Sequence, residues 1–106
     1  MARVHVLSDD LLFGSNLQAQ LERAGHAVSL GMAPVEGTEL VIADLTIDPA
    51  ARVERLAGLA VPVLAYYSHV ESDVRELAAG LALAVPRSRM AREAPELVAR
   101  ALATAP

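Results

Sequence analysis

Three apolar runs of this sequence end in side chains that carry carboxylate or hydroxyl oxygens. These ends are Ser8-Asp9-Asp10, Asp44 and Ser68. If the runs are parallel strands, their carboxyl ends share one edge of a sheet, which is where ligands bind in such sheets. We therefore expect these groups to meet in one acidic pocket. Such a pocket could be the binding site of a small ligand or the active site of an enzyme.

Two other kinds of chemistry have little support. Ser68 and His69, with Asp44, have the side-chain types of a nucleophilic triad, but adjacent residues point in different directions and no G-x-S-x-G elbow surrounds Ser68. His5, His26 and His69 do not have the spacing of helical metal ligands, so we expect structural histidines, with His69 in the loop above the pocket. No glycine-rich phosphate-binding motif occurs. We therefore expect no catalytic residues.

The composition narrows the class of protein. The chain has 106 residues, a net charge of −4 and no cysteine, and all nine of its basic residues are arginine. We expect one domain over residues 1–106, without disulfides or thiolate metal sites. The acidic balance argues against nucleic-acid binding. No apolar run approaches the ~20 residues that span a bilayer, so we expect no membrane segment and a cytoplasmic location.

Strand-like and helix-like segments alternate along the chain. Short β-branched or apolar runs predict strands at 4–7, 26–30, 40–43, 61–67 and 81–85. Helices are expected from Asp9 or Asp10 to about Ala24, at 49–57, at 72–79 and at 91–103. In the first helix the apolar stripe is predicted at Leu12, Leu17, Leu21 and Ala24. In the last helix the inward residues are predicted to be Leu97, Val98, Ala101 and Leu102.

This alternation predicts an α/β fold with right-handed crossovers and a parallel sheet. One link departs from the usual pattern. Only eight residues, Gly31–Thr38, separate the second and third strands, whereas a parallel crossover usually takes a dozen or more residues with a helix. Eight extended residues reach at most ~26–29 Å, which is just enough to return along one strand and cross to the next position in the sheet. We therefore expect the second helix to be absent or very short.

Four segments follow one another in a characteristic order along nearly the whole chain. They are a polar, acidic turn after the first strand, a strand ending in aspartate, a strand ending in a hydroxyl, and an Ala-Ala-Gly turn. Their residues are Ser8-Asp9-Asp10, Glu39–Leu45, Val61–Ser68 and Ala78-Ala79-Gly80. Their order and spacing resemble those of the chemotaxis-regulator-like receiver domains of response regulators. The resemblance implies a flavodoxin-like α/β fold with a doubly wound, five-stranded parallel sheet in the order 2-1-3-4-5.

The resemblance implies a role for each pocket residue. Asp44 falls on the aspartate that accepts a phosphoryl group, and Asp9 with Asp44 would bind Mg²⁺. Ser68 falls on the family's switch hydroxyl and Arg87 on the family's lysine, so both would contact phosphoryl oxygens. The rim of the pocket would comprise Ser8, Asp10, His69 and Ser88.

Four departures from the family pattern indicate a pseudo-receiver. Ser8 replaces a carboxylate, Arg87 replaces the lysine, Ala84 replaces the switch aromatic of the fifth strand, and Gly31–Thr38 has no room for a full helix. Arginine keeps the charge of lysine but offers a bulkier planar fork. Arg87 could instead pair with Asp44 and close the pocket.

We therefore expect an atypical receiver domain that acts as a protein–protein interaction module in bacterial signalling or regulation. Its partner would bind the face formed by the fourth helix, the fifth strand and the last helix. The alanine-rich last helix could also support a homodimer. A phospho-accepting response regulator using Asp44 with Mg²⁺ is the alternative, and a small-ligand-binding flavodoxin-like protein is the third possibility.

Overall fold

One parallel sheet organises the molecule. The computed structural model describes residues 2–33, 35–68, 76 and 78–104. Five strands lie in the order β2-β1-β3-β4-β5, which confirms the predicted topology. They are β1 (Arg3–Leu7), β2 (Ala27–Leu30), β3 (Leu40–Asp44), β4 (Val63–Tyr67) and β5 (Leu83–Pro86). The strand β4 begins two residues later than predicted, after Pro62, which has no N–H to donate to the ladder.

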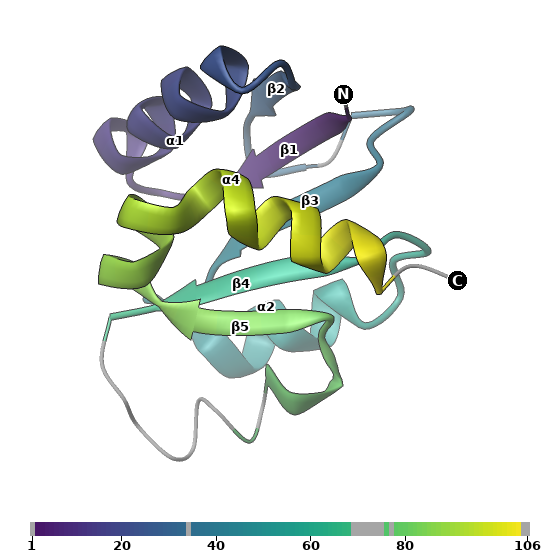
Figure 1. Ribbon diagram of the computed structural model, residues 1–106. Helices are drawn as coiled ribbons and strands as arrows, with labels where there is room; N and C mark the ends of the chain where they lie inside the picture. The colour runs from purple at the N-terminus through teal and green to yellow at the C-terminus, as the bar shows by residue number, and fades with distance from the viewer. Residues whose placement is uncertain (1, 34, 69–75, 77, 105–106) are drawn as a thin grey trace.

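Helices cover both faces of this sheet. They are α1 (Leu11–Arg23), α2 (Pro49–Leu56) and α4 (Arg87–Ala103), with a short 3₁₀ helix, η1 (Ala78–Gly80), before β5. Figure 1 shows α1 and α4 in front of the sheet and α2 behind it. Most of the helix predicted at 72–79 lies outside the described residues.

The segment between β2 and β3 contains no helix in its described residues, as the short link predicts. Two glycines shape it. Gly31 and Gly37 have φ of +150° and +88°, which side chains disfavour, and a Cβ on Gly37 would lie 2.8 Å from a guanidinium nitrogen of Arg3. His5 holds the start of the link, because its Nε2 lies 3.0 Å from the carbonyl oxygen of Gly31.

The buried stripe of α1 differs from the predicted one. The helix buries Gly14, Leu17 and Leu21, whereas Leu12 is 76% exposed and Ala24 is also exposed. Leu12 precedes Leu17 by five residues, which turns it well away from the Leu17 side of the helix. At Gly14, a Cβ would lie only 3.3 Å from the Leu30 side chain, so the missing side chain lets the helix approach β2 closely.

The last helix starts at Arg87 rather than at the predicted residue 91, and it is kinked. Glu93 has non-helical dihedrals (φ −125°, ψ 24°) two residues before Pro95. Proline cannot donate to the carbonyl of Ala91 four residues earlier. The side chain of Gln20 in α1 donates to that carbonyl at 3.1 Å, so the kink leaves it satisfied.

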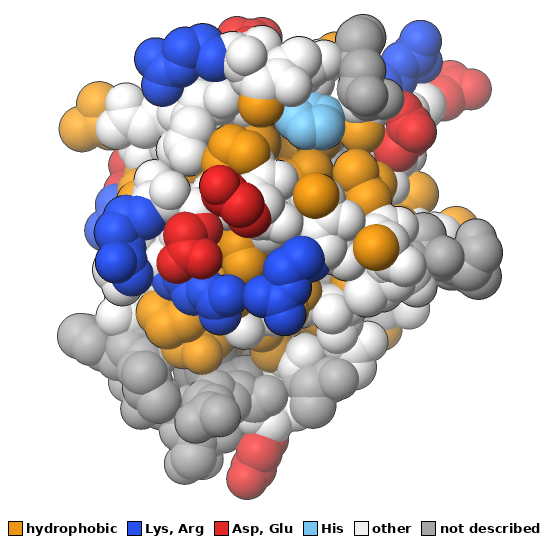
Figure 2. All heavy atoms as spheres, viewed as in Figure 1, with side chains coloured by type: hydrophobic (Ala, Val, Ile, Leu, Met, Phe, Trp, Pro, Cys, Tyr) orange, Lys and Arg blue, Asp and Glu red, His pale blue; other side chains and the backbone are white. Residues whose placement is uncertain are grey.

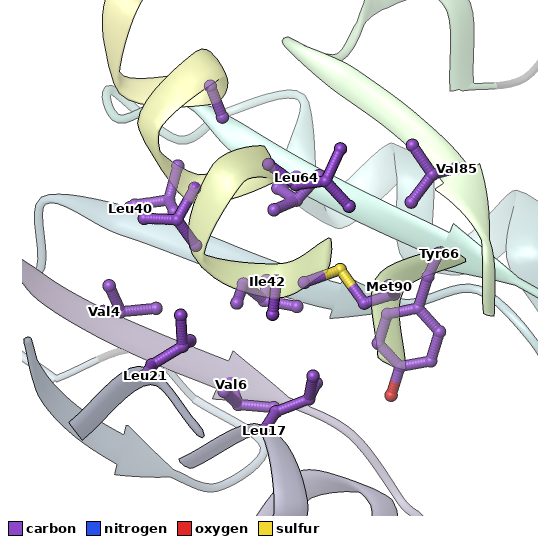
Figure 3. Close-up of a cluster of buried hydrophobic side chains, with 14 of the residues drawn as sticks. Val4, Val6, Leu17, Leu21, Leu40, Ile42, Leu64, Tyr66, Val85 and Met90 are labelled. Atoms are coloured by element: carbon purple, nitrogen blue, oxygen red, sulfur yellow. The ribbon is translucent and has the colours of Figure 1, made fainter. Parts of the chain in front are cut away.

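Alternate strand residues build two cores, one on each face. The larger core lies between the sheet and helices α1 and α4, and Figure 3 shows its side chains. The smaller core lies on the α2 face and includes Val41, Ala43 and Leu56. The predicted inward residues of α4 are confirmed: Leu97, Val98 and Ala101 are buried, and Leu102 packs partly buried against them.

Candidate functional site

The carboxyl ends of β1, β3 and β4 meet at one edge of the sheet, as predicted. Asp44 is the last residue of β3 and lies beside Tyr66 of β4 in the strand register. Ser8 directly follows β1, and its hydroxyl lies 2.9 Å from an Asp44 carboxylate oxygen. Both residues are shielded from solvent, Asp44 at 2% exposure and Ser8 at 8%. The sequence placed both residues at this edge, but it assigned Ser8 to the rim of the pocket and predicted no hydrogen bond between Ser8 and Asp44.

The carboxylate of Asp44 is hydrogen-bonded on both of its oxygens. Ser8 Oγ donates to Oδ2 at 2.9 Å. The backbone N–H of Thr46 donates to Oδ1 at 2.8 Å, and the Thr46 hydroxyl donates to the same oxygen. Neutral donors therefore satisfy both oxygens of this buried carboxylate, as buried polar atoms require.

Ser8 links Asp44 to a tyrosine beneath the pocket. The Tyr66 hydroxyl donates to Ser8 Oγ at 3.0 Å, and the backbone N–H of Asp10 donates to the same oxygen at 3.1 Å. With its own donation to Asp44, the Ser8 hydroxyl uses its one proton and both lone pairs. In Figure 3 the hydroxyl of Tyr66 points out of the apolar cluster that surrounds its ring.

Burial governs the ionisation of Tyr66. The desolvation of its fully buried side chain raises the pKa of the hydroxyl well above its usual value, and the negative charge of Asp44 adds to this effect. The hydrogen bond with Ser8 acts in the opposite direction but is the smaller influence. Tyr66 was not among the residues that the sequence assigned to the pocket.

Asp9 is paired with an arginine that the sequence reasoning missed. Arg52 of α2 donates through Nη2 to Asp9 Oδ2, and through Nη1 to the backbone carbonyl of Asp44 at 3.0 Å. The Arg52 side chain is 11% exposed. A signal existed in the sequence: Arg52 follows Asp44 by eight residues, at the start of a helix that must return along the sheet.

Asp10 and Arg87 form a second pair on the other side of the pocket. The Asp10 side chain caps α1 by accepting the Phe13 N–H, and its other oxygen accepts from Arg87 Nη2 at 2.7 Å. The Arg87 guanidinium also lies over the Phe13 ring, 4.4 Å from its centre. Arg87 therefore contacts Asp10, and the suggested pairing of Arg87 with Asp44 is wrong.

The remaining predicted residues show no contact with the Asp44 carboxylate in the described part of the chain. Ser68 follows β4 and is exposed, and Ser88 is exposed in the first turn of α4. His69 lies outside the described residues. His5 and His26 are structural, as predicted: His5 is buried with its Nδ1 2.7 Å from Ser29 Oγ, and His26 Nδ1 accepts the Ala2 N–H.

The residues present do not suit a divalent cation. Mg²⁺ requires several free oxygen ligands in near-octahedral geometry. Here both Asp44 oxygens accept hydrogen bonds, Asp9 is paired with Arg52, and Ser8 stands where the resembling family has a third carboxylate. Among the described residues, no group of three His, Asp or Glu side chains is placed to hold a metal. Binding of Mg²⁺ at Asp9 and Asp44 stays a prediction.

The surface around the α1 and α4 face carries charges of both signs. Figure 2 shows acidic and basic side chains interspersed on this face rather than a continuous basic area. In the part of the chain that is described, no helix is long and apolar enough to cross a membrane.

Comparison with known proteins shows the fold. Neither a family model nor a curated protein matches the sequence. Among solved structures, a response regulator receiver protein from Burkholderia phymatum is similar over 99% of this chain and 98% of its own, with 25% identity and a TM-score of 0.78. A receiver domain protein from Clostridium thermocellum is similar over 97% and 95% (15% identity, TM-score 0.75).

A third similar structure is the non-phosphorylated HemR receiver domain from Leptospira biflexa. It is similar over 100% of this chain and 98% of its own, with 17% identity and a TM-score of 0.72. Together with the strand order, these similarities show that the chain has the fold of response-regulator receiver domains.

Proposed function

We propose that this chain is an atypical receiver domain that acts in bacterial signalling as a protein–protein interaction module, without phosphorylation of Asp44. The observation that carries the proposal is the closed state of this carboxylate. It is 2% exposed, and donors from Ser8 and Thr46 hold both of its oxygens. A phospho-acceptor must present a free oxygen to the incoming phosphorus.

The charges around Asp44 support the same proposal. Phosphoryl transfer to a carboxylate needs cationic groups that offset the charge of both reactants. Among the described residues, Arg52 and Arg87 contact this acidic edge, and each is engaged with its own aspartate, Asp9 or Asp10. Neither guanidinium is free to meet a phosphoryl group unless an existing ion pair breaks.

The first turn of α1 offers an apolar contact point beside the closed pocket. Leu11 and Leu12 are 72% and 76% exposed, although both are large hydrophobic residues. Exposed apolar side chains that lie next to each other are typical of contact sites. We propose that they add to the face of β5 and α4 that the family resemblance implies.

The phosphorylation part is tested by amide NMR with Mg²⁺ and then with beryllofluoride, a phosphoryl mimic. We expect the resonances of Ser8, Asp9 and Asp44 to stay unchanged in both additions. Asp44→Asn is the control, because a response that persists in this variant does not arise at Asp44. Shifts at Asp44 that spread to α4 in the wild type alone would support a working phospho-acceptor instead.

The interaction part is tested by affinity capture from a bacterial lysate. Wild type and Asp44→Asn should capture the same protein with the same affinity, because binding does not depend on the phospho-acceptor. Leu11→Asp and Leu12→Asp should lose it. A protein captured equally by all four, or one that requires Asp44, would contradict the proposal.

A small-ligand-binding protein has weaker support. A hollow of about 640 Å³ opens at the amino edge of the sheet, lined in part by Leu56, Val63 and Leu81. This hollow lies at the edge opposite Asp9, Asp10 and Asp44. A ligand bound there would not contact the polar groups at the carboxyl ends of the strands, on which the prediction of a ligand-binding protein was based.

A further inference from the structure

We propose that the guanidinium of Arg52 is a built-in cation that takes the place of a divalent metal at this acidic edge, so that the pocket holds its charges together without Mg²⁺. The inference rests on the proposed function, because it explains how the domain keeps one state without metal or phosphate.

The geometry of Arg52 matches that role. One of its terminal nitrogens donates to the Asp44 backbone carbonyl at 3.0 Å, and the other donates to Asp9 Oδ2. The two acceptors belong to the two residues that the sequence assigned to Mg²⁺. A planar guanidinium fork is suited to joining two oxygens in this way.

The shielded positive charge of Arg52 opposes the binding of a metal ion at Asp9 and Asp44. The Arg52 side chain is 11% exposed, so water screens its charge poorly. A guanidinium cannot lose its proton to accommodate a second cation. A divalent ion that bound Asp9 and Asp44 would therefore have to displace Arg52 or lie against its positive charge.

The start of α2 delivers the arginine to this position. Asp48 adopts a left-handed conformation (φ 49°), and Pro49 begins the helix directly after it. The backbone N–H of Arg52 closes the first turn by donating to the carbonyl of Asp48 at 3.2 Å. This sharp reversal places Arg52 next to the end of β3, where its side chain reaches back to Asp44.

The test compares Mg²⁺ titrations of wild type, Arg52→Met and Arg55→Met by amide NMR. Methionine keeps most of the apolar stem of arginine and removes the charge. Arg55 is an exposed arginine on the same helix and serves as the matched control. We expect no pocket shifts in the wild type and in Arg55→Met. In Arg52→Met we expect shifts at Asp9 and Asp44, with an Mg²⁺ affinity at least about tenfold higher than in the wild type.

Two results would overturn the built-in cation. One is Mg²⁺ uptake at Asp9 and Asp44 in the wild type, and the other is an Arg52→Met variant that is folded and as inert as the wild type. If Arg52→Met does not fold, the guanidinium resonances of ¹⁵N-arginine-labelled wild type decide. Arg52 should show separate, slowly rotating Nη signals that Mg²⁺ does not change, and averaged signals would refute the contact.

The two proposals fail in different ways. Mg²⁺ entering the wild-type pocket without any response to beryllofluoride refutes the built-in cation and leaves the interaction module in place. A beryllofluoride response at Asp44 of the wild type refutes the proposed function itself.

Discussion

Two helices on opposite faces of the sheet each bring one arginine to the same acidic edge, but the two contacts differ in exposure. The Arg52 side chain of α2 is 11% exposed, whereas the Arg87 side chain of α4 is 44% exposed. Their partners differ less, at 37% for Asp9 and 42% for Asp10. Arg52 also donates to a backbone carbonyl, whereas Arg87 rests on an aromatic ring.

The helices that carry these arginines are anchored differently. The long helix α4 buries five residues, which are Met90, Ala94, Leu97, Val98 and Ala101. The short helix α2 buries only Leu56 and has no side-chain cap at its start. Because apolar burial is small in α2, the polar contact of Arg52 carries a larger share of its attachment. The same residue type therefore has unequal structural weight on the two faces.

The largest effect is expected for Arg52→Met. This substitution removes two hydrogen bonds that a charged donor makes to Asp9 and to the backbone carbonyl of Asp44. Because Asp44 is buried, water replaces the bond to its carbonyl poorly. We expect the free energy of unfolding to fall by about 2 kcal/mol, measured by urea denaturation. Arg55→Met should change it by less than ~0.5 kcal/mol. An equal fall in the free energy of unfolding in Arg52→Met and Arg55→Met would contradict the larger structural role of Arg52.

The burial of Tyr66 should also affect how the free energy of unfolding changes at alkaline pH. Burial raises the pKa of Tyr66 in the folded protein, so the stabilisation by its neutral hydroxyl is complete below the unfolded value of ~10. It is lost as the pH rises from there toward the folded pKa. The wild type should therefore lose about 1.4 kcal/mol more per pH unit above ~10 than Tyr66→Phe does.

The alkaline measurement is a series of urea denaturations between about pH 9 and 11. Identical slopes for wild type and Tyr66→Phe would show that Tyr66 is not buried against Ser8 as described.

The smallest effect is expected for Arg87→Met. Its ion pair with Asp10 is exposed, and its position over Phe13 adds little at such a site, so the loss should stay below ~1 kcal/mol. Molar salt should shrink this loss further, whereas the loss in Arg52→Met should persist. Urea denaturation at low and high salt measures both, with the exposed Arg92→Met as control. A loss as large as that of Arg52→Met would remove the distinction between the two faces.

The strands and helices could be predicted from local pattern, and their order in the sheet from the resemblance to receiver domains. Strands and helices alternate with clear apolar runs, and the short Gly31–Thr38 segment indicated the missing helix. The buried positions of α4 followed from helical spacing. Leu12 was assigned wrongly because an apolar residue near the start of a helix need not face the core, and the pattern does not show which side the sheet covers.

The site could be predicted only in part. Asp44 and Ser8 were found because parallel strands must end at one edge. Arg52 and Tyr66 were missed because their roles depend on how a helix returns along the sheet and on which way one side chain of β4 reaches. Arg87 was located at the edge, but its partner proved to be Asp10.

By itself, the sequence determined which residues end each strand, and so which polar groups share the carboxyl edge. This follows because strands joined by crossover connections run parallel, so their carboxyl ends fall on one edge of the sheet. Only the tertiary structure decided how those groups are paired. The choice among several nearby aspartates and arginines depends on burial and on differences of an ångström in reach, and residue spacing does not specify either.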